Sequence, residues 1–179
     1  MTEHPVTHDL IVTEMGRDYL GDDAPPDEIN RIKEEQHYGW PWCYGANIHD
    51  RNFDTRAISP CREPLVTPSM IDLPAHSAPL GIAFIPKSWR DEWWGSALVA
   101  LHGSWNSTQP VGYKIIRLIM DEQGRYYGSE DVVDGWLTPT ATIGRPVDIV
   151  LDRTESEMYI SDDSSGSIYV LRPDRRYEK

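Results

Sequence analysis

Short apolar runs separated by turn-forming residues dominate this sequence. The stretch AHSAPLGIAFIPKSWRDEWWGSALVALHGSWNSTQPVGYKIIR, residues 75–117, shows the pattern most clearly. Its runs at 81–85, 97–101 and 113–118 are predicted strands, because each is short, β-branched or aromatic at several positions, and bounded by Gly, Pro or Ser. The chain is therefore expected to be all-β.

Ionisable and aromatic side chains stand where these strands meet loops. His76 precedes the first predicted strand, and His102, Ser104 and Trp105 follow the second. Residues at strand ends are carried by loops on a rigid scaffold, which is where functional groups concentrate. We expect any chemistry to gather at this end of the strands.

The same strand-loop-strand pattern recurs on both sides of this stretch. DLIVTEMGRD with EINRIK, SALVALHGSW with GYKIIRL, and EMYISDDSSGSIYVLR read as three versions of one unit. Repeated units of antiparallel strands favour a β-propeller over a sandwich. Further strands are predicted at 9–14, 28–33, 130–137, 147–151, 157–161 and 167–171.

The number of repeats is too small for a closed propeller, which has four or more blades of four strands. The sequence predicts a half blade at 9–33, a long loop at 34–75, a full blade at 80–137 and a C-terminal blade at 146–172. Only a weak strand near Leu65 is expected in the long loop. The chain is therefore expected to form part of a ring.

Charge and hydropathy exclude several kinds of partner. The formal net charge is −12, which disfavours nucleic acid and anionic membranes. No apolar run is long enough for a membrane helix, and the first residues, MTEHPVTHDLIVTE, lack the pattern of a signal peptide. Plain solubility, neutral sugars and calcium remain compatible with this composition.

Cys43 and Cys61 are the only two cysteines. A structural zinc site needs more ligands at tighter spacing, so the choice lies between a disulfide and two buried thiols. We favour the disulfide, because the polar, turn-rich segment between the cysteines has little else to hold it, and with it an oxidising compartment.

The loop after the first predicted strand is rich in carboxylates. They lack the D-x-D-x-D-G register of an EF-hand, so a solvated acidic loop is favoured over a calcium site made of side chains. Further on, HYGWPWCYG reads as a rigid turn whose rings cap the sheet edge. The carboxylates are Asp18, Asp22, Asp23, Asp27 and Glu28.

Several segments, in this order, resemble the C-terminal half of the soluble pyrroloquinoline quinone (PQQ) dependent glucose/sorbosone dehydrogenases, the sorbosone dehydrogenase-like branch most closely. They are TEMGRDYLGDDAPPDEINRI, HYGWPWCYG, HSAPLGIAF, ALVALHGSWN, GYKIIRL and GRPVDIVLD followed by MYISDDSSGSIYVL. The resemblance implies a six-bladed propeller, periplasmic or secreted, that oxidises a sugar at C1 with PQQ lying on calcium. It also supports a disulfide between Cys43 and Cys61.

The resemblance implies roles for six residues. The main-chain carbonyls of Gly16 and Arg17 match the family's calcium ligands, and calcium prefers oxygen ligands. His76, His102 and Trp105 match the motifs that line the cofactor pocket. Arg145 matches an arginine that pairs with a cofactor carboxylate, which suits a tricarboxylate such as PQQ.

One part of the family pattern has no counterpart here. The family's general base is a histidine in the N-terminal half, and neither His4 nor His8 matches its motif. The sequence therefore predicts a dehydrogenase fragment that is inactive unless an N-terminal half, or a second copy of this chain, completes the ring. The alternatives are a non-catalytic propeller module that binds a sugar or a protein, and a gluconolactonase-like hydrolase.

Overall fold

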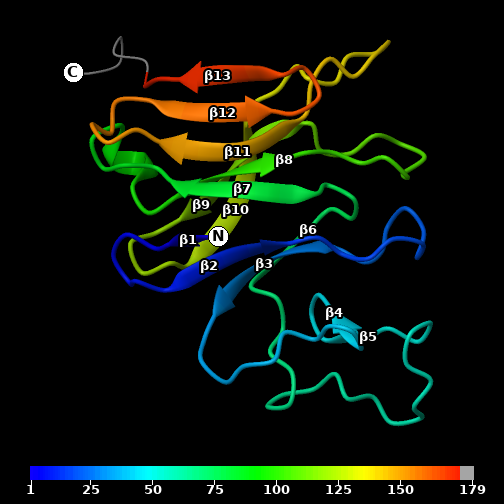
Figure 1. Ribbon diagram of the computed structural model, residues 1–179. Coiled ribbons are helices and arrows are strands. Elements are labelled where there is room, and N and C mark those ends of the chain that lie inside the picture. Colours follow the sequence, from blue (N-terminus) through cyan, green and yellow to red (C-terminus); the bar gives the residue numbers. More distant parts are fainter. Residues whose placement is uncertain (174–179) are drawn as a thin grey trace.

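Three antiparallel sheets, stacked in chain order, make up most of the molecule (Figure 1). The computed structural model describes residues 1–173. The first sheet contains β1 (Thr2–Glu3), β2 (Leu10–Glu14), β3 (Asp27–Ile32) and β6 (Ile71–Leu73). The second contains β7 (Pro79–Phe84), β8 (Ala97–Leu101), β9 (Lys114–Met120) and β10 (Tyr126–Val133). The third contains β11 (Pro146–Leu151), β12 (Met158–Asp162) and β13 (Ser167–Leu171).

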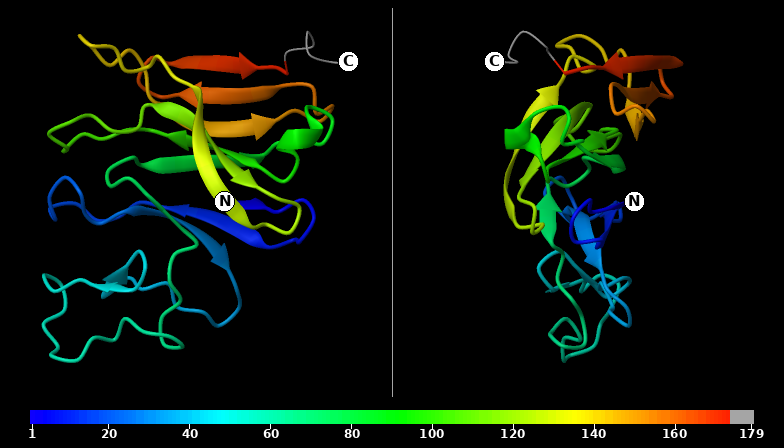
Figure 2. Two further views of the ribbon diagram at one scale, coloured as in Figure 1. Left: turned by 180° about the vertical axis from the view of Figure 1, so that it is seen from behind. Right: turned by 90° about the vertical axis from the view of Figure 1, so that its left-hand side faces the viewer.

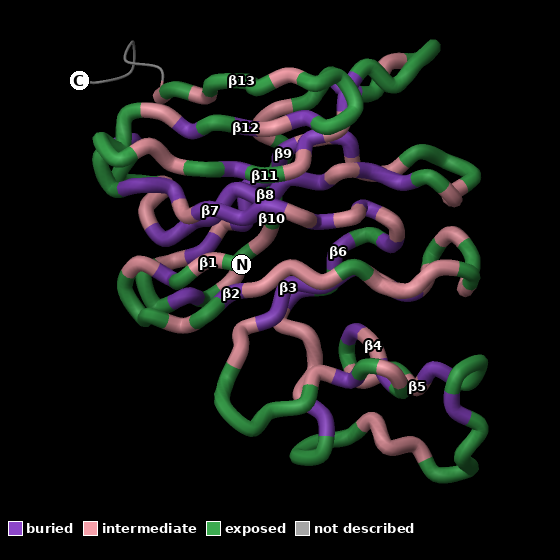
Figure 3. Tube along the Cα trace, viewed as in Figure 1, coloured by how far each residue is buried: buried purple, intermediate pink, exposed green. Residues whose placement is uncertain are grey.

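Two hydrophobic cores join the sheets, one on each face of the second sheet. Ile11 and Ile29 of the first sheet pack with Val99 and Leu118 of the second. The other core joins the opposite face of the second sheet to the third sheet and includes Leu98, Ala100, Ile115, Met158 and Ile160. Figure 3 shows buried residues concentrated in these central strands.

The strand β8 explains why this packing follows from the sequence. All five residues of ALVAL are buried. A strand covered on one face alternates apolar and polar residues, whereas a strand covered on both faces is apolar throughout. Figure 2 shows the first and third sheets on opposite sides of the second. The four-stranded sheets are successive blades of a β-propeller.

The predicted half blade at 9–33 was wrong, because four strands complete this sheet. The strand β6 pairs with β3 only after a long insertion, residues 33–70, which hid it from a local pattern search. The strand β1 has two residues, too few for any alternation. Around Leu65 the chain makes a turn rather than a strand.

Other strands lie close to their predicted positions. Ala97–Leu101 and Ser167–Leu171 have the predicted bounds, while the strand predicted at 130–137 runs instead from Tyr126 to Val133. The predicted long loop at 34–75 contains β6 and the short pair β4 (Cys43–Tyr44) and β5 (Ile48–His49). A short 3-10 turn, η1 (Asp91–Trp93), lies between β7 and β8.

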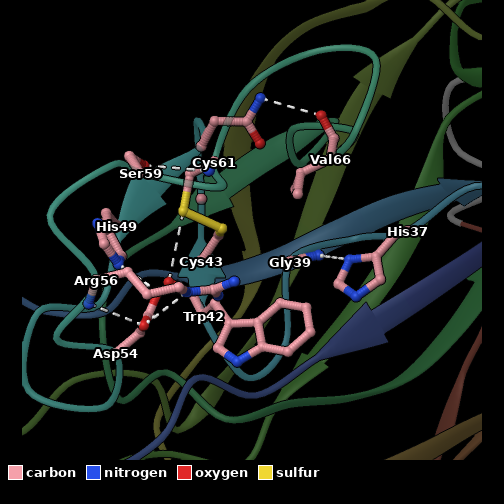
Figure 4. The surroundings of a disulfide bond; sticks show 12 residues. His37, Gly39, Trp42, Cys43, His49, Asp54, Arg56, Ser59, Cys61 and Val66 are labelled. Carbon is pink, nitrogen blue, oxygen red and sulfur yellow. Dashed lines mark hydrogen bonds and ion pairs between the residues drawn. A yellow bond between two sulfur atoms is a disulfide. The ribbon is translucent and has the colours of Figure 1, made fainter.

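The predicted disulfide is present and holds the insertion together. Cys43 and Cys61 are bridged, with their Cα atoms 5.7 Å apart. The bridge sits beside Trp42, and a separate ion-pair group formed by Asp54 with His49 and Arg56 lies next to it (Figure 4). The insertion has a few short strands and buries few apolar residues, so the bridge is its main covalent constraint.

We expect the double substitution Cys43→Ser with Cys61→Ser to lower the free energy of unfolding by about 3 kcal/mol, because the bridge restricts a loop of this length in the unfolded chain. Urea denaturation of the oxidised proteins measures the difference. Reductant should bring the wild type to the stability of the variant. Equal stabilities of oxidised wild type and variant would contradict the prediction.

A second stability element is the fully buried His4 in the N-terminal turn. Its Nδ1 accepts the N–H groups of Val6 and Thr7 at 3.2 and 3.1 Å, and its ring lies edge-on to Phe84 at 4.8 Å. Burial lowers the pKa of His4 below its usual value. The folded state therefore holds the neutral imidazole.

Stability should consequently depend on pH through this residue. The unfolded chain binds a proton at His4 more readily than the folded chain, so the free energy of unfolding should fall as pH drops below about 6.5. Denaturation midpoints between pH 5 and pH 8 measure the slope, which His4→Gln should reduce. Equal slopes in the wild type and His4→Gln would contradict the prediction.

Candidate functional site

Loops from all three sheets meet at one end of the strands and enclose a cavity of about 290 Å³. The loops follow β2, join β6 to β7, follow β8 and precede β11. Five of the six residues singled out from the sequence line this cavity, namely Gly16, His76, His102, Trp105 and Arg145. The sixth, Arg17, extends its side chain to the insertion instead.

Asp27, at the start of β3, fastens two sides of the cavity. Its carboxylate accepts the N–H of Gly16 through Oδ1 and the N–H of Ala78 through Oδ2, each at 2.7 Å. The residue is only 2% exposed. Burial raises the pKa of this carboxyl, while the two N–H groups favour its charged form. Asp27 thus links the loop after β2 to the loop before β7.

His76 is held in a fixed orientation at the cavity wall. Its backbone has φ of 65°, and its Nε2 lies 2.8 Å from the carbonyl oxygen of Gly21. A carbonyl only accepts, so Nε2 carries the hydrogen. The other ring nitrogen, Nδ1, lies 4.0 Å from Oδ1 of Asp18. The imidazole side chain is only 6% exposed.

His102 is paired with a carboxylate from the third sheet. Its Nε2 donates to Oδ1 of Asp163 at 2.9 Å. The backbone N–H groups of His102 and Gly103 donate to the carbonyls of Ala78 and Ser77, which joins the two loops. Thus His102 is oriented by both its neighbours in the second sheet and a loop of the third.

Gly103 is required by the shape of this loop. Its φ is +96°, and a Cβ there would lie 2.6 Å from the ring of Tyr113. The same tyrosine donates its hydroxyl to the carbonyl of Ser104. The close contact between backbone and ring therefore depends on the missing side chain of Gly103.

Arg145 clamps the loop that follows β8. Its guanidinium donates from Nε to the carbonyl of His102 at 3.1 Å and from Nη2 to the carbonyls of Gly103 and Ser104. It also lies 5.4 Å above the ring of Tyr113. The residue places a permanent positive charge beside the cavity while holding His102 in position.

Trp105 and Tyr19 form the exposed rim. The two side chains are 66% and 82% exposed, respectively, and their rings meet edge to face at 6.5 Å. Large rings at this level of exposure offer an apolar surface to a planar or cyclic ligand. The rim thus joins the loop after β2 to the loop after β8.

Carboxylates of the acidic loop accept hydrogen bonds from the loop that follows β8. Asp18 accepts the side-chain amide of Asn106 at 2.7 Å, and Asp22 accepts both the N–H and the hydroxyl of Thr108. The hydrogen bonds from Thr108 lower the pKa of Asp22. Residues 1–173 contain no cluster of three or more His, Cys, Asp or Glu side chains arranged to hold a metal.

The main chain at Gly16 lies at the wall of this cavity. Among the hydrogen bonds of residues 1–173, none is accepted by the carbonyl oxygen of Gly16 or Arg17. A Cβ on Gly16 would lie 2.7 Å from the ring of Pro25 and 2.9 Å from the carbonyl of Pro26, so the backbone can run here only as glycine. Unpaired carbonyl oxygens are suitable ligands for a hard cation.

Comparison with known proteins identifies the family. The family model described as TrAA12-like matches residues 17–174 of this chain. The chain belongs to the TrAA12-like family. An uncharacterized protein of Borreliella burgdorferi is 38% identical over 170 residues, 93% of this chain and 44% of the relative. A PQQ-dependent pyranose dehydrogenase of Coprinopsis cinerea is 28% identical over 139 residues, 63% of this chain and 17% of the relative.

Solved structures agree with the propeller fold of this TrAA12-like chain. The calcium structure of a Trichoderma reesei enzyme of family AA12 superimposes with a TM-score of 0.73 at 22% identity, covering 96% of this chain and 50% of the other. The holo PQQ domain of the Coprinopsis cinerea pyranose dehydrogenase gives 0.69 at 19% identity, covering 96% and 52%. The soluble aldose sugar dehydrogenase of Escherichia coli gives 0.62 at 19% identity, covering 97% and 44%.

These comparisons confirm the predicted family and fold. The chain spans about half the length of the structures that it matches, or less. Within residues 1–173 no helix is long and apolar enough to cross a membrane. The likeness to a sorbosone dehydrogenase branch in particular stays a prediction.

Sequence reasoning missed several residues that hold the site together. The sequence marks Asp27 only as one carboxylate of an acidic loop, directly before the strand predicted at 28–33. Asp163 lies between the strands predicted at 157–161 and 167–171, and its contact with His102 spans 61 residues. Tyr113 was included in a predicted strand. Such contacts depend on which loops meet in space, which the linear pattern does not contain.

Replacing Asp27 by Asn should lower the free energy of unfolding by about 2 kcal/mol, because the amide can accept at one atom only and leaves a buried N–H without an acceptor. Chemical denaturation measures the loss. Asp23 is exposed in the loop that precedes β3, so Asp23→Asn is the matched control and should change stability little. Equal effects of the two substitutions would show that Asp27 does not fasten the cavity.

Proposed function

We propose that this chain supplies one side of the PQQ and calcium site of a sugar dehydrogenase. The observation that carries the proposal is the convergence of four loops on one cavity in a TrAA12-like chain. Those loops bring together residues that the resemblance assigned to cofactor and metal, far apart in sequence. The names of the relatives, which include a PQQ-dependent pyranose dehydrogenase, support the cofactor and the sugar substrate.

Each residue has a proposed role that its surroundings support. The carbonyls of Gly16 and Arg17 bind calcium. His76 and His102 line the cofactor pocket with ring nitrogens oriented by their partners. Arg145 offers a positive charge to a PQQ carboxylate, which the surrounding acidic chain would otherwise repel.

Trp105 provides an apolar ring at the cavity mouth, where it covers the cofactor and limits access of water. Bound in this cavity, PQQ would supply the hydride acceptor for oxidation at the sugar C1 carbon, and a calcium ion would supply a Lewis acid. The residues of this chain bind and orient the cofactor and the metal. We nominate none of them as the general base, which we place on the completing half of the ring.

We propose that the half that activity requires is an N-terminal half that carries the base. A second copy of this chain is the alternative for closing the ring, and it would supply no base. An oxidising location, periplasmic or secreted, is proposed because the bridge between Cys43 and Cys61 is stable there.

A non-catalytic sugar-binding module is the second candidate. The exposed rings of Trp40, Phe53 and Trp105 favour it, because aromatic faces stack against sugar rings. It predicts saccharide binding that needs neither PQQ nor calcium. The similar proteins include PQQ-dependent dehydrogenases, which disfavours the gluconolactonase-like alternative.

Titration of the purified chain with PQQ, with and without calcium, tests the proposal. We expect PQQ binding to depend on calcium, as measured by calorimetry and by the quinone absorbance. Arg145→Met should weaken PQQ binding at least about tenfold, because a hydrogen bond to a charged group contributes about 1.5–3 kcal/mol. Arg153→Met, in an exposed turn past the other end of β11, is the control. Absence of PQQ binding would contradict the proposal.

Glucose and sorbosone are then added to the loaded chain, alone and with the N-terminal half of a family member. We expect quinone reduction only when that half is present. Reduction by the chain alone would overturn the assignment of the base to the completing half and would make His76 and His102 the candidates. Saccharide binding without PQQ would favour the non-catalytic module.

A further inference from the structure

The insertion, residues 33–70, reaches the proposed calcium loop through one ion pair. Arg17 donates from Nε and Nη2 to the two carboxylate oxygens of Asp50, at 2.5 and 3.0 Å. The Asp50 side chain is 3% exposed and the Arg17 side chain 24%. A two-pronged arginine-carboxylate pair of this kind fixes orientation as well as distance. The carboxylate of Asp50 is thus far more buried than the carboxylate of a surface ion pair would be.

Asp50 is itself held rigidly within the insertion. Its carboxylate accepts the N–H groups of Asn52 and Phe53 at 3.0 and 3.1 Å, and its own N–H donates to the carbonyl of Trp42 at 2.8 Å. Trp42 precedes the bridged Cys43, and the sulfur of Cys61 lies 3.5 Å from the same Trp42 carbonyl. The disulfide therefore anchors the segment that carries Asp50.

A second contact fixes the insertion to the first sheet. The N–H of Gly45 donates to Oε1 of Glu28 at 2.5 Å, and Glu28 is 4% exposed. Glu28 directly follows Asp27, which holds the N–H of Gly16. Residues 16 and 17 are consequently held from two directions, by Asp27 at the backbone of Gly16 and by Asp50 at the side chain of Arg17.

We propose that Asp50 is a positioning residue for the metal loop, so that the disulfide-bridged insertion sets the calcium affinity of the cavity. The inference rests on the proposed function for the identity of the metal. The fork on Arg17 fixes where its backbone carbonyl points, and the neighbouring carbonyl of Gly16 follows. Outer partners that orient metal ligands commonly change affinity by 10–100-fold when removed.

Asp54 offers a matched control in the same insertion. Its side chain is also buried, at 9% exposed, and pairs with Arg56 and His49, both within the insertion (Figure 4). Asp50 and Asp54 thus share residue type, segment and paired state. They differ in that only Asp50 reaches Arg17.

Calcium titration by calorimetry of the wild type, Asp50→Asn and Asp54→Asn, in the presence of PQQ, tests the proposal. We expect Asp50→Asn to raise the calcium dissociation constant at least about tenfold and Asp54→Asn to leave it within about twofold. The temperature is kept well below unfolding, so that a general loss of stability does not move the constant. Equal constants for wild type and Asp50→Asn would overturn the proposal.

Hydrogen exchange of segment 15–19 in the calcium-free chain separates this proposal from the proposed function. We expect Asp50→Asn, and not Asp54→Asn, to lose protection there. If wild-type protein binds no calcium, the proposed function fails, and unchanged exchange in Asp50→Asn would independently overturn the positioning role. Arg17→Lys keeps the positive charge but loses the two-pronged contact, and it serves as the second variant if Asp50→Asn does not fold. We expect its calcium dissociation constant to lie between those of the wild type and Asp50→Asn. A calcium dissociation constant equal to that of the wild type would also overturn the proposal.

Discussion

The burial of both faces of the second sheet is the constraint on which the rest of this structure depends. Leu98 and Val99 are adjacent in β8 and point to opposite faces, yet both are fully buried, each in a different core. One sheet alone could not bury them, so a sheet is needed on each side. Those three sheets then bring their loops to one end, and the cavity exists because the cores fix the distance between loops.

The loops are joined by buried charge rather than by apolar packing. Asp27 spans the loops after β2 and before β7, and Arg145 holds the carbonyls of the loop after β8. A carboxylate that accepts two N–H groups, or a guanidinium that donates to several carbonyls, satisfies backbone groups that water would otherwise reach. Hydrogen bonds therefore fix the loops at the cavity, and the charged groups of Asp27 and Arg145 stand in its wall.

The local sequence pattern was sufficient to predict a strand that is apolar on both faces, such as Ala97–Leu101, or one that begins directly after a turn, such as Ser167–Leu171. It was insufficient for Ile71–Leu73, a strand of three residues that pairs with β3 across the whole insertion. The sequence motifs identified residues that line the cavity, but they did not identify the residues that hold those side chains and loops in place. Asp50 shows why: nothing near it in sequence indicates that Arg17, in the loop after β2, is its partner.

The outer faces of the two end sheets differ in a way that bears on how a ring would be completed. On the first sheet, Glu28 and Asn30 point away from the core, are hydrogen-bonded to each other at 3.0 Å, and lie under the insertion through Gly45. On the third sheet, the corresponding face carries exposed apolar side chains. Val150, Tyr159 and Val170 are cross-strand neighbours there, at 55%, 39% and 41% exposed, and Ile168 on the same face is 71% exposed.

A contiguous apolar sheet face costs free energy in water, whereas a hydrogen-bonded polar face under a covering segment does not. In a propeller, each blade covers the apolar face of the next. The third sheet therefore has the kind of surface that the proposed completing half requires, and the first sheet has part of its own cover already. The asymmetry follows from the insertion, the same segment that holds Arg17 and the proposed calcium loop.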